Sequence, residues 1–130
     1  MKKKGTVILI VFFIDNLQHG GIIMNNTIIV GRITAKPKFV KTNNNKYYLN
    51  FFMRFIGYRK KHVNIQVTLT DDLAIKMNNK LKEGYVVKVS GQLDTDVWKD
   101  NNGHHERMKI FSEKIEPYKG SLPDGFDMPR

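Results

Sequence analysis

Two segments of this chain alternate apolar and other side chains at every second position, and this pattern constrains the fold most strongly. Between residues 46 and 58 the apolar set comprises Tyr47, Leu49, Phe51, Met53 and Phe55. Between residues 62 and 70 it comprises Val63, Ile65, Val67 and Leu69. Side chains alternate between the two faces of a β-strand, so we predict two strands whose apolar sets line a core. In the second strand His62, Asn64, Gln66, Thr68 and Thr70 should then point outward.

The outward face of the first strand combines aromatic rings with a cation. Its residues are Tyr48, Asn50, Phe52, Arg54, Ile56 and, at its end, Tyr58. The stretch 24–70 around it contains nine Lys or Arg and no Asp or Glu, within a chain of net charge +10. A field of one sign calls for an anionic partner. Cations for phosphates and flat rings for unstacked bases are what single-stranded nucleic acid requires. The alternative is that these rings cover a subunit contact or a loop.

The other segments supply further strands and one helix. Residues 27–33 predict a strand in which Gly31 marks a bulge or a close backbone approach. After Pro37 comes a short extended piece, 38–41, and then an Asn-rich turn. A helix capped by Thr70 or Asp71 should run to about Glu83 and stop at Gly84, with an apolar stripe of Leu73, Ala74, Met77 and Leu81.

The second half predicts a hairpin. Residues 85–93 and 107–115 predict two strands, joined by a polar loop over 94–105 whose tip is 99–103. The resulting order is strand, strand, strand, helix, strand, strand. This is the order of an OB-fold: an all-β, five-stranded Greek-key barrel with one short helix, which binds oligonucleotides on one face. We place the domain at 24–116 and a short flexible tail at 117–130.

Residues 1–23 are predicted to lie outside the core. Three lysines and a short apolar run, 7–14, imitate a signal peptide, but no small-residue cleavage site follows. Residues 20–24 back-translate to a ribosome-binding sequence ahead of a start codon at Met24. Three interpretations stay open: a mis-assigned start, a membrane-targeting segment, or an ordered extension.

Several kinds of chemistry lack the residues they need. The chain has no cysteine, which excludes disulfides and thiol catalysis and fits a reducing cytoplasm. His104, His105 and Glu106 are adjacent on a predicted strand and point to opposite faces, so no metal site is expected. Gly31, Gly57, Gly84 and Gly91 are isolated from one another, so no phosphate-binding glycine-rich loop is expected. We expect neither an enzyme nor a cofactor.

Three motifs resemble the bacterial single-stranded DNA-binding protein family. The segment 24–34, MNNTIIVGRIT, with Pro37 is similar to that family's opening strand and its G-R-L-T-x-x-P turn. Lys82-Glu83-Gly84 with Val87 to Leu93 is similar to its K-G-x-x-V-x-V-x-G-x-L segment. Trp98 falls where the family has a base-stacking tryptophan. The similarity covers about Met24 to Ile115.

The resemblance implies an OB-fold that binds single strands independently of sequence, in DNA replication, recombination or repair. It also implies a homotetramer or a dimer that acts in the cytoplasm, near the nucleoid. The protein would be encoded by a bacterium or by a mobile element that a bacterium carries. No membrane contact is implied, and replication or recombination proteins are further expected partners. The predicted phosphate contacts are Arg32, Lys36, Lys38, Arg59, Lys60 and Lys61. The predicted stacking residues are Tyr48, Phe52, Tyr58 and Trp98, with Arg54 in either role and Gln66 and Lys88 as further contacts.

The chain also departs from that family. Asn64 and Thr70 stand where the family usually carries aromatic residues, and Asp94 and Asp96 stand where it often has basic ones. We expect the rings of Tyr48, Phe52 and Tyr58 to replace part of the lost stacking. The segment 124–130 echoes the family's acidic tip, but Arg130 ends the chain in place of a Phe.

Two alternatives stay open. The first is a primosome-type OB protein that binds single strands and replication proteins. The second is a protein-interaction subunit with little affinity for DNA, in which the outward rings form a subunit contact. An aromatic protein interface should depend far less on salt than a DNA interface does.

Overall fold

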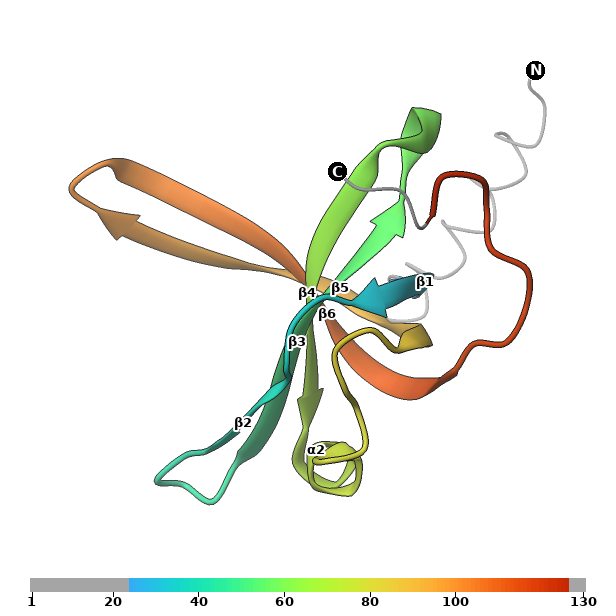
Figure 1. Cartoon of the computed structure of the whole chain (residues 1–130). Coiled ribbons are helices and arrows are strands. Elements are labelled where there is room, and N and C mark those ends of the chain that lie inside the picture. Colours follow the sequence, from blue (N-terminus) through green and yellow to red (C-terminus); the bar gives the residue numbers. More distant parts are fainter. Residues whose placement is uncertain (1–23, 127–130) are drawn as a thin grey trace, which may run out of the picture.

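The computed structural model describes residues 24–126, which form a β-barrel with one helix (Figure 1). The strands are β1 (Thr27–Ile33), β2 (Lys38–Lys41), β3 (Tyr47–Ile56), β4 (His62–Thr70), β5 (Val86–Asp100) and β6 (Gly103–Pro117), with α2 (Asp71–Met77) after β4. The sheet order is β1-β5-β6-β4-β3-β2, and a further pairing of β1 with β3 closes the barrel. β4 and β6 run parallel, and the other paired strands of the described residues are antiparallel. The fold is the OB-fold that the order of elements predicts.

The alternating segments bury the predicted faces. Leu49, Phe51 and Met53 of β3 and Val67 and Leu69 of β4 are buried in one core. Each such side chain contributes about 1.5–3 kcal/mol by leaving water. Their alternation therefore fixes which side chains of β3 and β4 remain on the outside, and these are the side chains that form the site.

Two glycines allow backbones to meet where the barrel closes. A Cβ on Gly31 would lie 2.7 Å from the carbonyl oxygen of Arg54, across the contact between β1 and β3. This confirms the close approach predicted at Gly31. A Cβ on Gly91 would overlap the carbonyl oxygen of Phe111, at a bulge where the β5–β6 register shifts between Ser90 and Gly91.

The helix is shorter than predicted. It ends at Met77 rather than near Glu83, because Asn78 leaves the helical region at ψ 130° and Asn79 takes a left-handed φ of 71°. Asparagine tolerates that conformation and competes for backbone hydrogen bonds, which makes it a poor residue for continuing a helix. Leu81 is buried as predicted, although it lies beyond the helix.

The hairpin of β5 and β6 is longer than predicted. The expected loop over 94–105 was wrong except at its tip, because β5 continues to Asp100 and β6 begins at Gly103. Asp100 accepts a hydrogen bond from the backbone N–H of Asn102 (2.8 Å), and Gly103 has a φ of 109°. We call residues 94–108 the arm, which projects from the barrel (Figure 1).

Residues 118–126 return along the barrel after β6. Phe126 is only 5% exposed, the guanidinium of Arg32 lies 5.4 Å from its ring centre, and His62 Nε2 lies 3.1 Å from the carbonyl oxygen of Gly125. The expected flexibility of 117–130 stays a prediction. Residues 1–23 and 127–130 lie outside the described part, and so do the three interpretations of the N-terminal segment. Among the helices described, none is long and apolar enough to cross a membrane.

Candidate nucleic-acid interface

The outward side of β3 carries a row of rings and polar groups. In the antiparallel register Tyr48 lies opposite Thr70 of β4, Phe52 opposite Gln66, and Arg54 opposite Asn64. Phe52 is 43% exposed, which is unusual for a phenylalanine on a strand with a full core behind it. Because these positions alternate with the buried ones, the sequence places them correctly.

β6 adds a second row that the sequence analysis missed. The parallel register sets Lys109 beside Gln66 and Phe111 beside Thr68. We call the outward residues of these three strands the platform: Tyr48, Asn50, Phe52, Arg54, Gln66, Thr68, Lys109 and Phe111. The signal was present as an alternation of His105, Arg107, Lys109 and Phe111, but the pairing of β4 with β6 is not visible in the sequence.

Hydrogen bonds run across the platform. Arg107 Nη1 donates to Gln66 Oε1 (3.4 Å), Gln66 Nε2 donates to Thr68 Oγ1 (3.5 Å), and Thr68 Oγ1 donates to Asn50 Oδ1 (2.7 Å). Thr68 is only 3% exposed, although its position in the alternation predicts an exposed side chain. It is covered because side chains of the neighbouring strands β3 and β6 rise on both sides of it.

The arm holds Trp98 at the edge of the platform. Trp98 is 40% exposed, and its ring stacks on His105 with 5.3 Å between ring centres. The guanidinium of Arg107 lies 5.4 Å from the same ring, a cation–π distance. Since Arg107 also donates to Gln66, a single side chain connects Trp98 to the platform. His105 in turn lies 2.8 Å from Asp100 Oδ1, which steadies the ring beneath Trp98.

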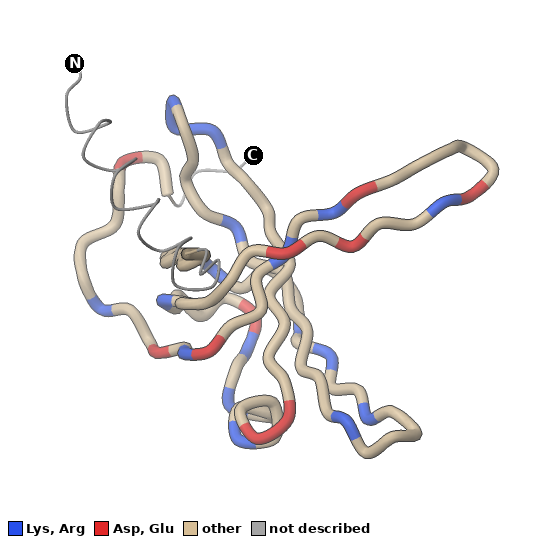
Figure 2. The backbone as a smooth tube through the Cα atoms, turned by 180° about the vertical axis from the view of Figure 1, so that it is seen from behind, with Lys and Arg blue, Asp and Glu red and all other residues tan. Residues whose placement is uncertain are grey.

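One acidic residue of the arm forms an ion pair with a lysine of the platform. Lys109 Nζ lies 2.8 Å from Asp96 Oδ1, and the Lys109 side chain is 14% exposed. The ammonium also lies 4.6 Å from the ring centre of Phe111. Asp94, by contrast, accepts a hydrogen bond from the backbone N–H of Thr95 (2.7 Å). Figure 2 shows both signs of charge along the arm.

The connection between β3 and β4 forms a cationic tip at residues 58–61. Tyr58 is exposed and lies under the guanidinium of Arg59 (5.1 Å). Arg59 and Lys60 both have positive φ, 58° and 61°, in a turn closed by a hydrogen bond from the Gly57 N–H to the Lys61 carbonyl oxygen (2.7 Å). Consecutive left-handed non-glycine residues are uncommon and cost energy. Figure 2 shows the resulting cluster of positive residues at one end of the molecule.

The other predicted contacts lie in several places. Lys38 is exposed on β2 opposite Asn50, next to the platform. Arg32 donates from Nη1 to the carbonyl oxygen of Gly84 (2.9 Å), and its guanidinium lies over Phe126. Lys88 lies on β5 between Val30 and Glu116, away from the platform strands β3 and β4.

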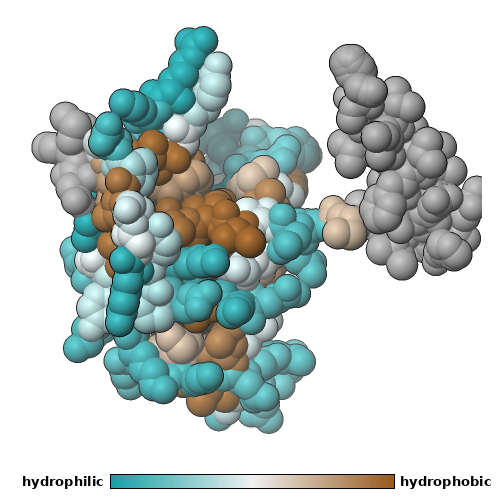
Figure 3. Space-filling model, turned by 90° about the vertical axis from the view of Figure 1, so that its right-hand side faces the viewer, coloured by the Kyte–Doolittle hydropathy of each residue, from teal (hydrophilic) through white to brown (hydrophobic). Residues whose placement is uncertain are grey.

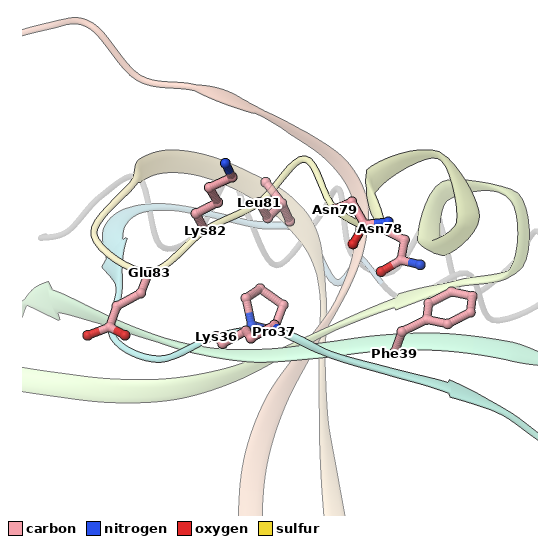
Figure 4. Close-up of a pocket in the computed structure, with 8 residues that line it drawn as sticks. All are labelled: Lys36, Pro37, Phe39, Asn78, Asn79, Leu81, Lys82 and Glu83. Carbon is pink, nitrogen blue, oxygen red and sulfur yellow. The ribbon is translucent and has the colours of Figure 1, made fainter.

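Lys36 lies in a separate hollow. Its lining comes from the β1–β2 connection, the start of β2 and the segment that follows α2, and includes Lys36, Pro37, Phe39, Asn78, Asn79, Leu81, Lys82 and Glu83 (Figure 4). Phe39 lies opposite Leu49, so it points to the other side of β2 from Lys38. The structure therefore does not bring Lys36 together with the platform.

The site brings exposed aromatic rings and cations onto one surface. Exposed rings at Phe52 and Trp98 lie near the cations Arg54, Arg107 and Lys109. Within residues 24–126, no group of three His, Cys, Asp or Glu side chains is placed to hold a metal ion.

Comparison with known proteins assigns the family. The model of the single-strand binding protein family matches residues 24–118. A search among curated proteins gave no match. Because the match covers most of the chain and every strand of the barrel, this chain belongs to the single-strand binding protein family.

Proposed function

We propose that this protein binds single-stranded DNA across the platform, with the arm on one side and the tip 58–61 at one end. Bases stack on Phe52 and Trp98, and on Tyr48 and Tyr58. Phosphates contact Arg54, Arg107 and Lys38, together with the three cations of the tip. Each stacked base contributes about 1–3 kcal/mol in such proteins, with little dependence on sequence.

One observation carries this proposal: Arg107 contacts both the Trp98 ring and Gln66 of the platform. That double contact connects the exposed ring of Trp98, through Arg107, to Gln66, which lies opposite the exposed Phe52 in the β3–β4 register. A surface of two rings with cations between them suits a flexible chain of bases and phosphates better than it suits a rigid duplex.

The register also supports the replacement of lost stacking. Tyr48 lies directly opposite Thr70, a position where an aromatic residue is usual in the resembling family. The aromatic ring is therefore on the adjacent strand, and the Cβ atoms of Tyr48 and Thr70 are about 5 Å apart. Phe52 lies two outward-facing pairs further along β3, opposite Gln66.

We place this activity in DNA replication, recombination or repair, in the cytoplasm, with the protein acting as a homo-oligomer. A contiguous exposed hydrophobic patch is a candidate contact between subunits. Figure 3, which views the side where 118–126 runs, shows a hydrophobic patch framed by hydrophilic residues.

Binding to a labelled oligo-dT and to the matching duplex, across a salt series, tests the proposal. With about six phosphates neutralised, the slope of log K against log salt should be near −4, so affinity falls about three-hundredfold between ~50 and ~200 mM salt. The full chain should bind oligo-dT tightly and the duplex weakly.

Equal and weak binding to both nucleic acids would contradict the proposal. The outward rings would then be explained as a protein contact, for which replication proteins are the expected class of partner. Such a contact would show little dependence on salt.

Replacing Asp96 by Asn should tighten binding to oligo-dT about threefold to tenfold at low salt. The substitution releases Lys109 for a phosphate, and one further phosphate contact steepens the salt slope by about 0.7. Fluorescence anisotropy titrations at several salt concentrations measure both quantities.

Glu106→Gln is the matched control for this prediction, because Asp94 lies directly opposite Lys109 in the β5–β6 register. It removes the same charge from the arm, but Glu106 pairs with Val97 and points to the other side of β6 from Lys109. Its salt slope should stay that of the unmodified protein. Equal slopes in all three proteins would show that Lys109 contacts no phosphate.

A further inference from the structure

A hollow of about 340 Å³ opens in the middle of the platform. Val40, Tyr48, Asn50, Gln66, Thr68, Lys109 and Phe111 line it. β4 runs between β3 and β6, so Tyr48 and Phe111 approach from opposite sides and nearly buried Thr68 forms the floor. Its size is within the range of small-molecule sites, ~300–1,000 Å³. Rings at the sides and amides at the base are the lining that proteins use to hold an unstacked base.

The hydrogen bonds around this hollow have a fixed direction. A guanidinium can only donate, so Arg107 must face the oxygen of the Gln66 amide. The Gln66 nitrogen is thereby turned toward Thr68, and it donates to the threonine hydroxyl. The Thr68 hydroxyl has a single hydrogen, which it donates to Asn50 Oδ1 (2.7 Å). Asn50 Nδ2 therefore keeps both N–H groups, which have no partner within residues 24–126.

From this polarity we infer that the hollow is a base-selective subsite, which binds the exocyclic carbonyl of thymine or uracil through the amide nitrogen of Asn50. A donor favours O4 of these bases and disfavours the amino group that cytosine carries at the same ring position. The inference rests on the proposed binding of single-stranded DNA and extends it. Stacking elsewhere on the platform accepts any base, whereas this position distinguishes a carbonyl from an amine.

Oligo-dU and oligo-dC of equal length are the matched ligands for the test. Their bases share one ring size and differ at the exocyclic group, and at pH 8 cytosine is neutral. The full chain, titrated by fluorescence anisotropy in one buffer, should bind oligo-dU about threefold to tenfold more tightly than oligo-dC.

Asn50→Asp is the decisive variant. It keeps an oxygen to accept the Thr68 hydrogen bond, so the floor of the hollow is retained, but it presents an acceptor where Asn50 presents a donor. The preference should invert in favour of oligo-dC. Asn44→Asp, at the exposed turn before β3, adds the same charge and should leave the preference unchanged.

Thr68→Val gives a second route that adds no charge. It breaks the chain of hydrogen bonds from Arg107 through Gln66 and Thr68 to Asn50, so the Asn50 amide can take either orientation. The ratio of the affinities for oligo-dU and oligo-dC should then approach one. Equal affinity of the unmodified protein for the two oligonucleotides, or an unchanged preference in Asn50→Asp, would overturn the subsite and leave the proposed function intact. Failure to bind either oligonucleotide would overturn the proposed function, and the subsite with it.

Discussion

Replacing Phe52 and Trp98 together by alanine should weaken binding to oligo-dT by at least about thirtyfold. Each ring stacks one base in the proposed complex, at about 1–3 kcal/mol per base, so losing both costs about 2–6 kcal/mol. Both side chains are strongly exposed in the free protein, so their removal leaves the core intact. Titration of labelled oligo-dT at moderate salt measures the loss, and thermal melting verifies that the variant is folded.

The matched control replaces two exposed apolar residues outside the platform. Val97 precedes Trp98 and points to the other side of the arm, and Ile75 is exposed on α2. Val97→Ala with Ile75→Ala removes apolar surface without removing a predicted stacking ring, and its affinity should match that of the unmodified protein. If both double variants lost affinity equally, the loss could not be assigned to base stacking.

Gly91→Ala should lower the stability of the protein by about 3 kcal/mol or more. The added methyl group meets the Phe111 carbonyl and lies 2.7 Å from the Cα of Ser112, and these are backbone atoms that cannot rotate away. Overpacking of this kind costs about 1–3 kcal/mol even where side chains can yield. For a domain of this size the melting temperature should fall by roughly 10–25 °C.

Ser90→Ala, on the other side of the same bulge, is the control. Its hydroxyl makes no hydrogen bond within residues 24–126, and its backbone pairs with Lys114 as before. Its melting temperature should stay within a few degrees of that of the unmodified protein. A Gly91→Ala variant that melts like Ser90→Ala would show that β5 and β6 can separate at the bulge without loss.

The core of the barrel follows from local sequence, because burial on a strand repeats at every second residue. The buried positions of β3 and β4 and the exposed ring of Phe52 are all visible in that period. The order of strands and helix then distinguishes the OB-fold from other small β-proteins. These features need no knowledge of which distant strands pair.

The features that the sequence did not predict have two causes: the pairing of strands that are distant in the chain, and the absence of a core beneath the arm. The arm has no regular alternation of apolar residues because no core lies beneath it, so its strands resemble a loop in the sequence. Lys109 and Phe111 belong to the platform only because β6 pairs with β4, from which it is separated by a helix and another strand. Thr68 is covered by residues of both neighbouring strands, which alternation along β4 alone cannot show.

The contact of Phe126 with Arg32 has a consequence for what unfolds as one unit. The family match ends at residue 118, whereas a nearly buried aromatic ring lies beyond it and packs under a cation of β1. Arg32 also holds the carbonyl oxygen of Gly84 at the entrance to β5, so a single guanidinium joins the first strand, the start of the long hairpin and the segment after β6. We therefore expect the part of the chain that unfolds cooperatively to extend past the end of the family match, at least as far as Phe126.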